Sequence, residues 1–171
     1  LKQEFSPKAI VLRNDSNVRK LENLSLETDV VYGECPEFIT AQIEGLSFSL
    51  DILHGQKTGF FLDQKENHAY VRHFTSGKRV LDCFTHLFVW AIHAALGGAT
   101  EVIGLDISEP AITQCRIHAE INHATSCQFK CVDVFDELKA INDRRESFDV
   151  IVLDPPAFAK SKSQVKEAIK G

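Results

Sequence analysis

The sequence contains no methionine, not even at position 1, and none of its five cysteines belongs to a C-x-x-C pair. An odd number of cysteines without that spacing argues against a disulfide framework and against a zinc site, so we expect no metal site. The lack of methionine, together with the helix-like ending KEAIKG, leads us to expect a fragment of a longer protein.

Long hydrophobic runs and an excess of basic residues are also missing. No apolar run approaches the roughly 20 residues that cross a bilayer. The start, LKQEFSPKAIVLRND, lacks the charged-then-apolar pattern of a signal peptide. We therefore predict a cytoplasmic protein with no membrane association. The net charge of −5 argues against a chain that mainly coats nucleic acid, because neutralising phosphates requires a basic surface.

A regular pattern begins at about residue 79. Short apolar runs alternate with segments of helical periodicity; the runs are RVLDCF, EVIGLD, CQFKCVD and FDVIVLD. Such alternation indicates an α/β fold with a parallel sheet covered on both faces. We predict one helix over 87–96, stopped by Gly97 and Gly98, a second that begins after Ser108 as N-cap, and a third over 134–141.

The residues before 79 show a different pattern. Four alternating stretches predict strands, namely AIVLRND, DVVYGE, FITAQIEG and LSFSLDI, and SNVRKLENL predicts a helix. We therefore predict a small α+β linking domain over 1–54 and a joining segment over 55–78, with a helix beginning near Asp63. A nucleotide-type domain over 79–171 follows.

Four predicted strands end in an aspartate, at intervals of 24, 27 and 21 residues: Asp82, Asp106, Asp133 and Asp154. Ligands of open α/β sheets bind beyond the carboxyl ends of the strands, so these carboxylates should line one rim. They would repel a pyrophosphate but would accept hydrogen bonds from a ribose diol, an ammonium group and an adenine amine. S-adenosylmethionine carries all three groups. The alternative for each aspartate is turn chemistry, in which the carboxylate binds its own backbone two residues on.

The stretch LDPPAFAKSKSQV follows the last of these strands. Its two prolines fix φ and remove two backbone donors, so they predict a rigid turn that holds Asp154 at the sheet edge. A planar base could stack on Phe158 in this loop. The alternative is a strand-ending loop with a core phenylalanine.

Several stretches together resemble a known family: HGQKTGFFLDQKENH, KRVLDCF, GGATEVIGLDIS, AITQCRIHAEIN, DVFD and FDVIVLDPPAFAKSK. They are similar to class I S-adenosylmethionine-dependent methyltransferases of large-subunit ribosomal RNA, and most of all to the cytosine-C5 group that carries an RNA-binding PUA domain. The resemblance covers about residues 8 to 170. It implies an incomplete Rossmann-like methyltransferase sheet, truncated at the C-terminus, with the linking domain in front and the PUA domain absent.

The resemblance also implies the roles of individual residues. Asp106 would hold the ribose hydroxyls of S-adenosyl-L-methionine, Asp133 with Val134 would meet the adenine edge, and Asp82 would lie near the methionine moiety. The further cofactor-binding candidates are Phe60, Asp63, Gln64, Phe84, Ile107 and Asp154. The catalytic candidates, which would border the methyl donor and the target base, are Asp154, Pro155 and Pro156.

The sequence departs from the family pattern in three respects. Leu87, Phe88 and Val89 replace a threonine-glycine pair and a small residue, and Trp90 replaces a phenylalanine. A phenylalanine side chain at position 88 would fill the space next to the cofactor unless the turn is rebuilt. His68 stands where an arginine is usual. The cysteine whose thiolate adds to the base would lie beyond Gly171.

The residues of this chain supply no replacement for that nucleophile. We expect Cys83, Cys115, Cys127 and Cys131 to be buried and inert, and Cys35 has no special claim to be a nucleophile. We interpret His86 and His93 as ordinary helix residues. The predicted function is RNA methylation that forms 5-methylcytosine in large-subunit ribosomal RNA. The alternatives are methylation of guanine N7, and a non-catalytic RNA-binding module with a decayed cofactor site. A nicotinamide-dependent dehydrogenase is disfavoured because no G-x-G-x-x-G follows the first strand.

The expected partner is ribosomal RNA, and the sequence leaves a homodimer open. Six basic residues are candidates for contacts with RNA phosphates, and an ordinary solvated surface explains them equally well. They are Lys57, Lys65, Arg72, Lys160, Lys162 and Lys166.

Overall fold

A computed structural model of the protein describes residues 1–55 and 61–156. The chain divides into two compact units, Leu1–Phe61 and Leu62–Gly171. This division falls inside the predicted joining segment, 55–78. The assignment of separate roles to 1–54, 55–78 and 79–171 stays a prediction.

The first unit contains two antiparallel strand pairs and two single-turn helices. Its elements are α1 (Lys2–Phe5), β1 (Ala9–Asn14), α2 (Val18–Leu21), β2 (Glu27–Gly33), β3 (Phe38–Ile43) and β4 (Leu46–Asp51). β1 pairs with β2, and β3 pairs with β4. Glu44 and Gly45 connect β3 to β4 with φ of 51° and 78°, as a two-residue hairpin turn requires. All four predicted strands are present, whereas α2 is shorter than the helix predicted from SNVRKLENL.

The second unit contains a parallel four-stranded sheet in the order β7-β6-β5-β8. Its strands are β5 (Arg79–Cys83), β6 (Glu101–Asp106), β7 (Cys127–Cys131) and β8 (Val150–Leu153). Its helices are η1 (Leu62–Gln64), α3 (Lys65–Tyr70), η2 (Val71–Phe74), α4 (Val89–Leu96), α5 (Glu109–Ile121) and α6 (Val134–Asp143). The predicted α/β fold is therefore confirmed.

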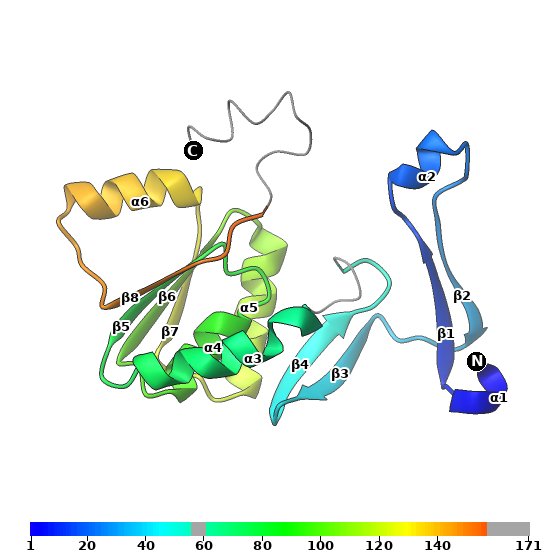
Figure 1. Cartoon of the computed structure of the whole chain (residues 1–171), viewed down its shortest axis with the longest axis horizontal. Coiled ribbons are helices and arrows are strands. Elements are labelled where there is room, and N and C mark those ends of the chain that lie inside the picture. The colour runs from blue at the N-terminus through cyan, green and yellow to red at the C-terminus, as the bar shows by residue number, and fades with distance from the viewer. Residues whose placement is uncertain (56–60, 157–171) are drawn as a thin grey trace. The chain divides into compact units, whose positions relative to one another are not determined.

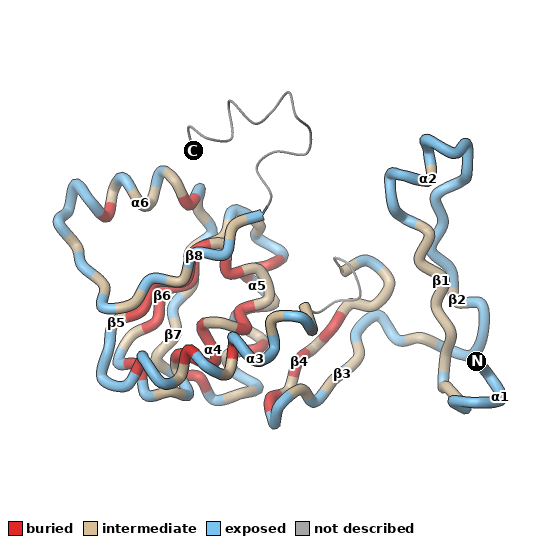
Figure 2. Tube along the Cα trace, viewed as in Figure 1, coloured by how far each residue is buried: buried red, intermediate tan, exposed pale blue. Residues whose placement is uncertain are grey.

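Helices cover both faces of this sheet (Figure 1): α4 and α5 lie on one face and α6 on the other. Leu81, Cys83, Ile103 and Leu105 form the core on the α6 side, where they pack against Val134 and Ile141. Val80 and Val102 alternate with them and are also fully buried. Buried residues accordingly concentrate in β5 and β6, whereas the β1–β2 pair has none (Figure 2). Burial on both faces explains why β5 and β6 are continuously apolar in sequence.

The helix ends follow the predicted chemistry. Ser108 caps α5, since its hydroxyl accepts a hydrogen bond from the amide of Ala111, and Gly97 ends α4. The prediction for His86 is wrong, because α4 begins only at Val89 and His86 lies in the preceding turn. Within the described residues, no helix is both long and apolar enough to span a bilayer.

Candidate functional site

The four aspartates lie at the carboxyl ends of the four parallel strands, and hence at one edge of the sheet. Asp82 and Asp106 belong to the ends of β5 and β6, Asp133 lies two residues beyond β7, and Asp154 directly follows β8. The charges of Asp154 and Asp106 both act on the carboxyl of Asp82. The sequence therefore located this edge correctly, and three of the four carboxylates form one electrostatic group.

Asp82 is the buried member of this group. Its side chain has no exposed surface, and the hydroxyl of Thr85 donates a hydrogen bond of 2.6 Å to Oδ2. Oδ1 is buried and has no hydrogen-bond partner among the described residues. Burial raises the pKa of Asp82 to about 7, and the negative charges of Asp154 and Asp106 add to this effect. Thr85 and the amide of Ala91 oppose the shift. Asp82 thus exchanges its proton near neutral pH.

Asp106 joins two strand–helix turns. Its Oδ1 accepts a hydrogen bond of 2.9 Å from the amide of Ser108, and its Oδ2 accepts one of 3.0 Å from the amide of His86. The first bond is the turn chemistry considered as an alternative, and the second ties the end of β6 to the turn after β5. Ile107, which follows, is 69% exposed.

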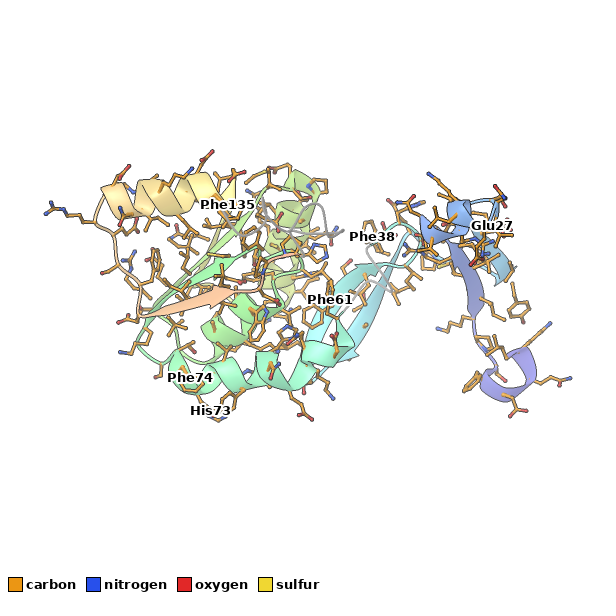
Figure 3. The ribbon with its side chains drawn as sticks, turned by 45° about the horizontal axis from the view of Figure 1, so that its top comes forward. Glu27, Phe38, Phe61, His73, Phe74 and Phe135 are labelled. Carbon is orange, nitrogen blue, oxygen red and sulfur yellow. The ribbon has the colours of Figure 1, made fainter. Side chains whose placement is uncertain are left out.

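Asp133 is the N-cap of α6. Its Oδ1 accepts hydrogen bonds from the amides of Phe135 and Asp136, at 2.9 and 3.2 Å. Val134 is buried in the core, so a contact between this residue and a ligand would have to come from its main chain. Phe135 lies in the first turn of α6 (Figure 3) and packs edge-to-face against Phe84, with ring centroids 5.8 Å apart.

The turn between β5 and α4 holds three non-glycine residues in the left-handed region. Phe84, His86 and Phe88 have φ of 62°, 44° and 70°. Phe88 thus adopts the conformation that a glycine would adopt without strain. Its ring is fully buried and packs edge-to-face on Phe129 of β7, with centroids 4.2 Å apart. The phenyl group therefore occupies the core beside the sheet.

Gly104 makes room for this packing. It pairs with Asp82 on one side and with Phe129 on the other. A Cβ at position 104 would lie 3.0 Å from the ring of Phe129 and 3.2 Å from the hydroxyl of Thr85. The missing side chain lets the Phe129 ring and the Thr85–Asp82 pair lie side by side.

Trp90 links α4 to the end of β8. Its indole Nε1 donates a hydrogen bond of 3.2 Å to Oδ2 of Asp154. His68 of α3 packs edge-to-face against the indole, with centroids 4.5 Å apart. Burial lowers the pKa of His68 to about 4, although the charges of Asp154 and Asp63 oppose this shift. His68 is therefore neutral at physiological pH.

His93 and Arg72 extend this cluster. The guanidinium of Arg72 donates a hydrogen bond of 2.9 Å to Nδ1 of His93, whose ring stacks 6.2 Å from that of His68. Burial lowers the pKa of His93 to about 4, and the charge of Arg72 contributes. His93 is a buried residue of α4, in agreement with its interpretation as a helix residue, and Arg72 has a partner inside the protein. The sequence gives no indication that these two histidines and Arg72 lie together.

The remaining candidates are more peripheral or lie outside the described residues. Asp63 and Gln64 belong to η1, where Asp63 is exposed and Gln64 accepts a hydrogen bond from the side chain of Asn67. Pro155 and Pro156 directly follow Asp154. The residues outside the described ranges are Phe60, Phe158, Lys57, Lys160, Lys162 and Lys166.

Four of the five cysteines have environments that keep the thiol protonated. Burial raises the pKa of Cys83 to about 11 and that of Cys127 to about 12, and it also raises the pKa of Cys115. Cys131 is exposed, so the prediction that it is buried is wrong, and a hydrogen bond with Glu109 raises its pKa. Because the thiolate is the reactive form, none of these four has the environment of a nucleophile.

A parallel sheet with helices on both faces and carboxylates beyond its strand ends defines a nucleotide-type binding domain. The chain belongs to the S-adenosylmethionine-dependent methyltransferase family, whose model matches residues 19–169. The predicted family and its cofactor, S-adenosylmethionine, are thereby confirmed.

Individual relatives agree with this assignment. Ribosomal RNA large subunit methyltransferase I of Aeromonas salmonicida is 43% identical over 166 residues, covering 95% of this chain and 42% of that protein. The protein of the same name from Tolumonas auensis is 41% identical and is covered to 44%. A solved putative methyltransferase in complex with S-adenosylhomocysteine is 31% identical, with a TM-score of 0.71, over 79% of this chain and 37% of that one. The chain thus spans about two fifths of its curated relatives.

Substitutions at Phe88 test the left-handed turn. Phe88→Ala removes the buried ring and should lower the free energy of unfolding by about 3 to 5 kcal/mol. Phe88→Gly removes the same ring but also relieves the strained backbone, so it should be about 1 kcal/mol more stable than Phe88→Ala. Urea unfolding of both variants measures the difference. Equal stability, or greater stability of the alanine variant, would contradict the left-handed conformation.

The raised pKa of Asp82 predicts how stability depends on pH. The unfolded carboxyl loses its proton near pH 4, whereas the folded one keeps it to about pH 7, so this group destabilises the fold progressively as pH rises through that interval. Asp82→Asn should therefore be more stable than the wild type at pH 7.5, and the gain should shrink toward pH 4. Denaturant unfolding across this range measures it. Asp149→Asn makes the same change at an exposed position and serves as the comparison variant.

Proposed function

We propose that the whole protein is an S-adenosylmethionine-dependent RNA methyltransferase that forms 5-methylcytosine in large-subunit ribosomal RNA. The observation that carries the proposal is the 43% identity, over 95% of this chain, with a protein named ribosomal RNA large subunit methyltransferase I. The choice of cytosine C5 rests on the resemblance of the chain as a whole to that group, since the Asp-Pro-Pro stretch does not distinguish cytosine-C5 from guanine-N7 methylation.

The rim carboxylates suit the polar groups of the cofactor. Asp82 has a buried Oδ1 without a hydrogen-bond partner among the described residues, and an ammonium group would supply a donor and a compensating positive charge. Each oxygen of Asp106 keeps a lone pair for a ribose hydroxyl. Asp133 is exposed and can accept from the adenine amine. When bound, S-adenosylmethionine supplies a methyl group attached to a positively charged sulfur.

The surroundings of these carboxylates complete the proposed cofactor site. We assign contacts with the cofactor to Phe60, Asp63, Gln64, Phe84, Ile107, Val134 and Asp154. Phe84 contributes a backbone in the left-handed region that turns the chain away from the strand end. Ile107 contributes an exposed apolar side chain directly after the ribose-binding aspartate.

We assign the boundary between methyl donor and target base to Asp154, Pro155 and Pro156. Two successive prolines restrict the main chain after Asp154, so the carboxylate and the following carbonyls keep a defined direction. Methylation at C5 also needs a thiolate that adds to C6 of the base. The raised pKa values of the cysteines from Cys83 onward agree with the prediction that this thiolate comes from a residue beyond Gly171.

The proposed assignment of the ribose to Asp106 can be tested by calorimetry with S-adenosylhomocysteine. Asp106→Asn removes the negative charge but keeps one oxygen acceptor, and it should weaken binding by about 1 to 3 kcal/mol. The matched control is Asp149→Asn, at the opposite edge of the sheet, where the carboxylate accepts from the amide of Arg79. Its affinity should equal that of the wild type. Unchanged affinity of Asp106→Asn would contradict the assignment.

The proposed reaction can be tested with the whole protein and unmodified large-subunit ribosomal RNA. Nucleoside mass spectrometry after incubation with S-adenosylmethionine should detect 5-methylcytosine. Formation of 7-methylguanosine would replace the proposed product by the alternative, and absence of any methylated nucleoside despite cofactor binding would contradict an RNA substrate. Light scattering of the same protein, alone and with RNA, tests whether it forms a homodimer.

A further inference from the structure

Asp154 differs from two other rim aspartates in how its carboxylate can be held. The carboxylates of Asp106 and Asp133 each accept a hydrogen bond from the amide two residues ahead, at Ser108 and Phe135. Asp154 is followed by Pro155 and Pro156, which have no N–H. The hydrogen bond from the amide two residues ahead, which the other two carboxylates accept, is therefore impossible at Asp154.

The indole of Trp90 supplies a donor instead. Its Nε1 lies 3.2 Å from Oδ2 of Asp154, across 64 residues of sequence. An indole N–H can only donate, and the rigid ring has two side-chain torsions to fix. A phenylalanine at this position would fill similar space but would offer no donor.

The indole is itself held in place. It belongs to the first turn of α4, directly after the buried Phe88 and Val89. The edge-to-face contact with the buried His68 restrains its ring, and His68 in turn stacks with His93. Arg72 donates to His93 and fixes the far end of this row. The donor at Trp90 thus has a defined direction before any ligand binds.

We propose that Trp90 is a positioning residue for Asp154. It holds the carboxylate toward α4, in place of the amides that the two prolines remove. The inference rests on the proposed function, because it concerns the residue that we assign to the boundary between methyl donor and base. It adds a residue, on a different element, that acts on the reaction through Asp154.

The first test detects the hydrogen bond between Trp90 and Asp154 and does not require enzymatic activity. Trp90 is the only tryptophan, so a ¹⁵N-labelled chain gives a single indole N–H cross-peak. Asp154→Ala should move this peak strongly. Asp149→Ala, which removes a carboxylate at the other edge of the sheet, should leave it in place. An indole peak that is indifferent to Asp154→Ala would overturn the proposal even if the protein methylates RNA.

The second test measures how loss of this hydrogen bond affects methyl transfer by the whole protein. Trp90→Phe should lower kcat for methyl transfer about tenfold, the size expected for one hydrogen bond to a charged acceptor. The control is Tyr70→Phe, which removes a polar group from an aromatic residue that packs on His73 and Phe74, and kcat should be unchanged.

A double-mutant cycle separates positioning from general damage. With Asp154→Ala there is no carboxylate to hold, so adding Trp90→Phe should have no further effect on kcat. A kcat of Trp90→Phe within twofold of the wild type would overturn the proposal, as would an equal loss in the Asp154→Ala background. If the wild type itself neither binds cofactor nor methylates RNA, the proposed function fails, and the indole peak still decides whether Trp90 holds Asp154.

Discussion

The two hydrogen bonds of the Asp106 carboxylate hold together the turns from which the site is built. One oxygen accepts from the amide of Ser108, at the start of α5, and the other accepts from the amide of His86, in the turn before α4. β5 and β6 are already paired in register, so this carboxylate extends their association past the end of the strands. The edge of the sheet is thereby fixed without any ligand.

This arrangement has a conformational and an electrostatic cost. Three left-handed residues between β5 and α4 each oppose the preference of L-amino acids, by roughly 1 kcal/mol or more. A fully buried carboxyl at Asp82 adds a penalty that grows as it loses its proton. The packing of Phe88 on Phe129, and the space above Gly104, stabilise the same turn from inside the core. A strained, partly unsatisfied segment surrounded by well-packed elements is typical of a binding site.

The strands and helices of the second unit could be predicted from the sequence, but the geometry of the turn between β5 and α4 could not. Apolar runs predicted β5 to β8, and Ser108 could be identified as a cap, because both depend on local chemistry. Left-handed φ at Phe88 could not be predicted, since its cause is the tertiary packing of the ring. The sequence also gave no indication that Arg72 binds His93, because that contact depends on how η2 packs against α4. Neither interpretation of Arg72, a contact with RNA phosphates or an ordinary solvated surface, includes this bond.

The aspartates of the rim show how one residue type can serve several purposes along a sheet edge. Turn chemistry and ligand binding were treated as alternatives, yet Asp106 and Asp133 meet the first and keep free lone pairs for the second. Asp82 has neither a turn amide nor exposure, so its charge depends on what lies next to it. A cationic ligand would favour the ionised carboxylate, whereas an anionic one would face the negative charges of Asp106 and Asp154. The negative charges at this edge thus favour a cationic ligand over an anionic one, which agrees with the proposal that it binds a positively charged methyl donor.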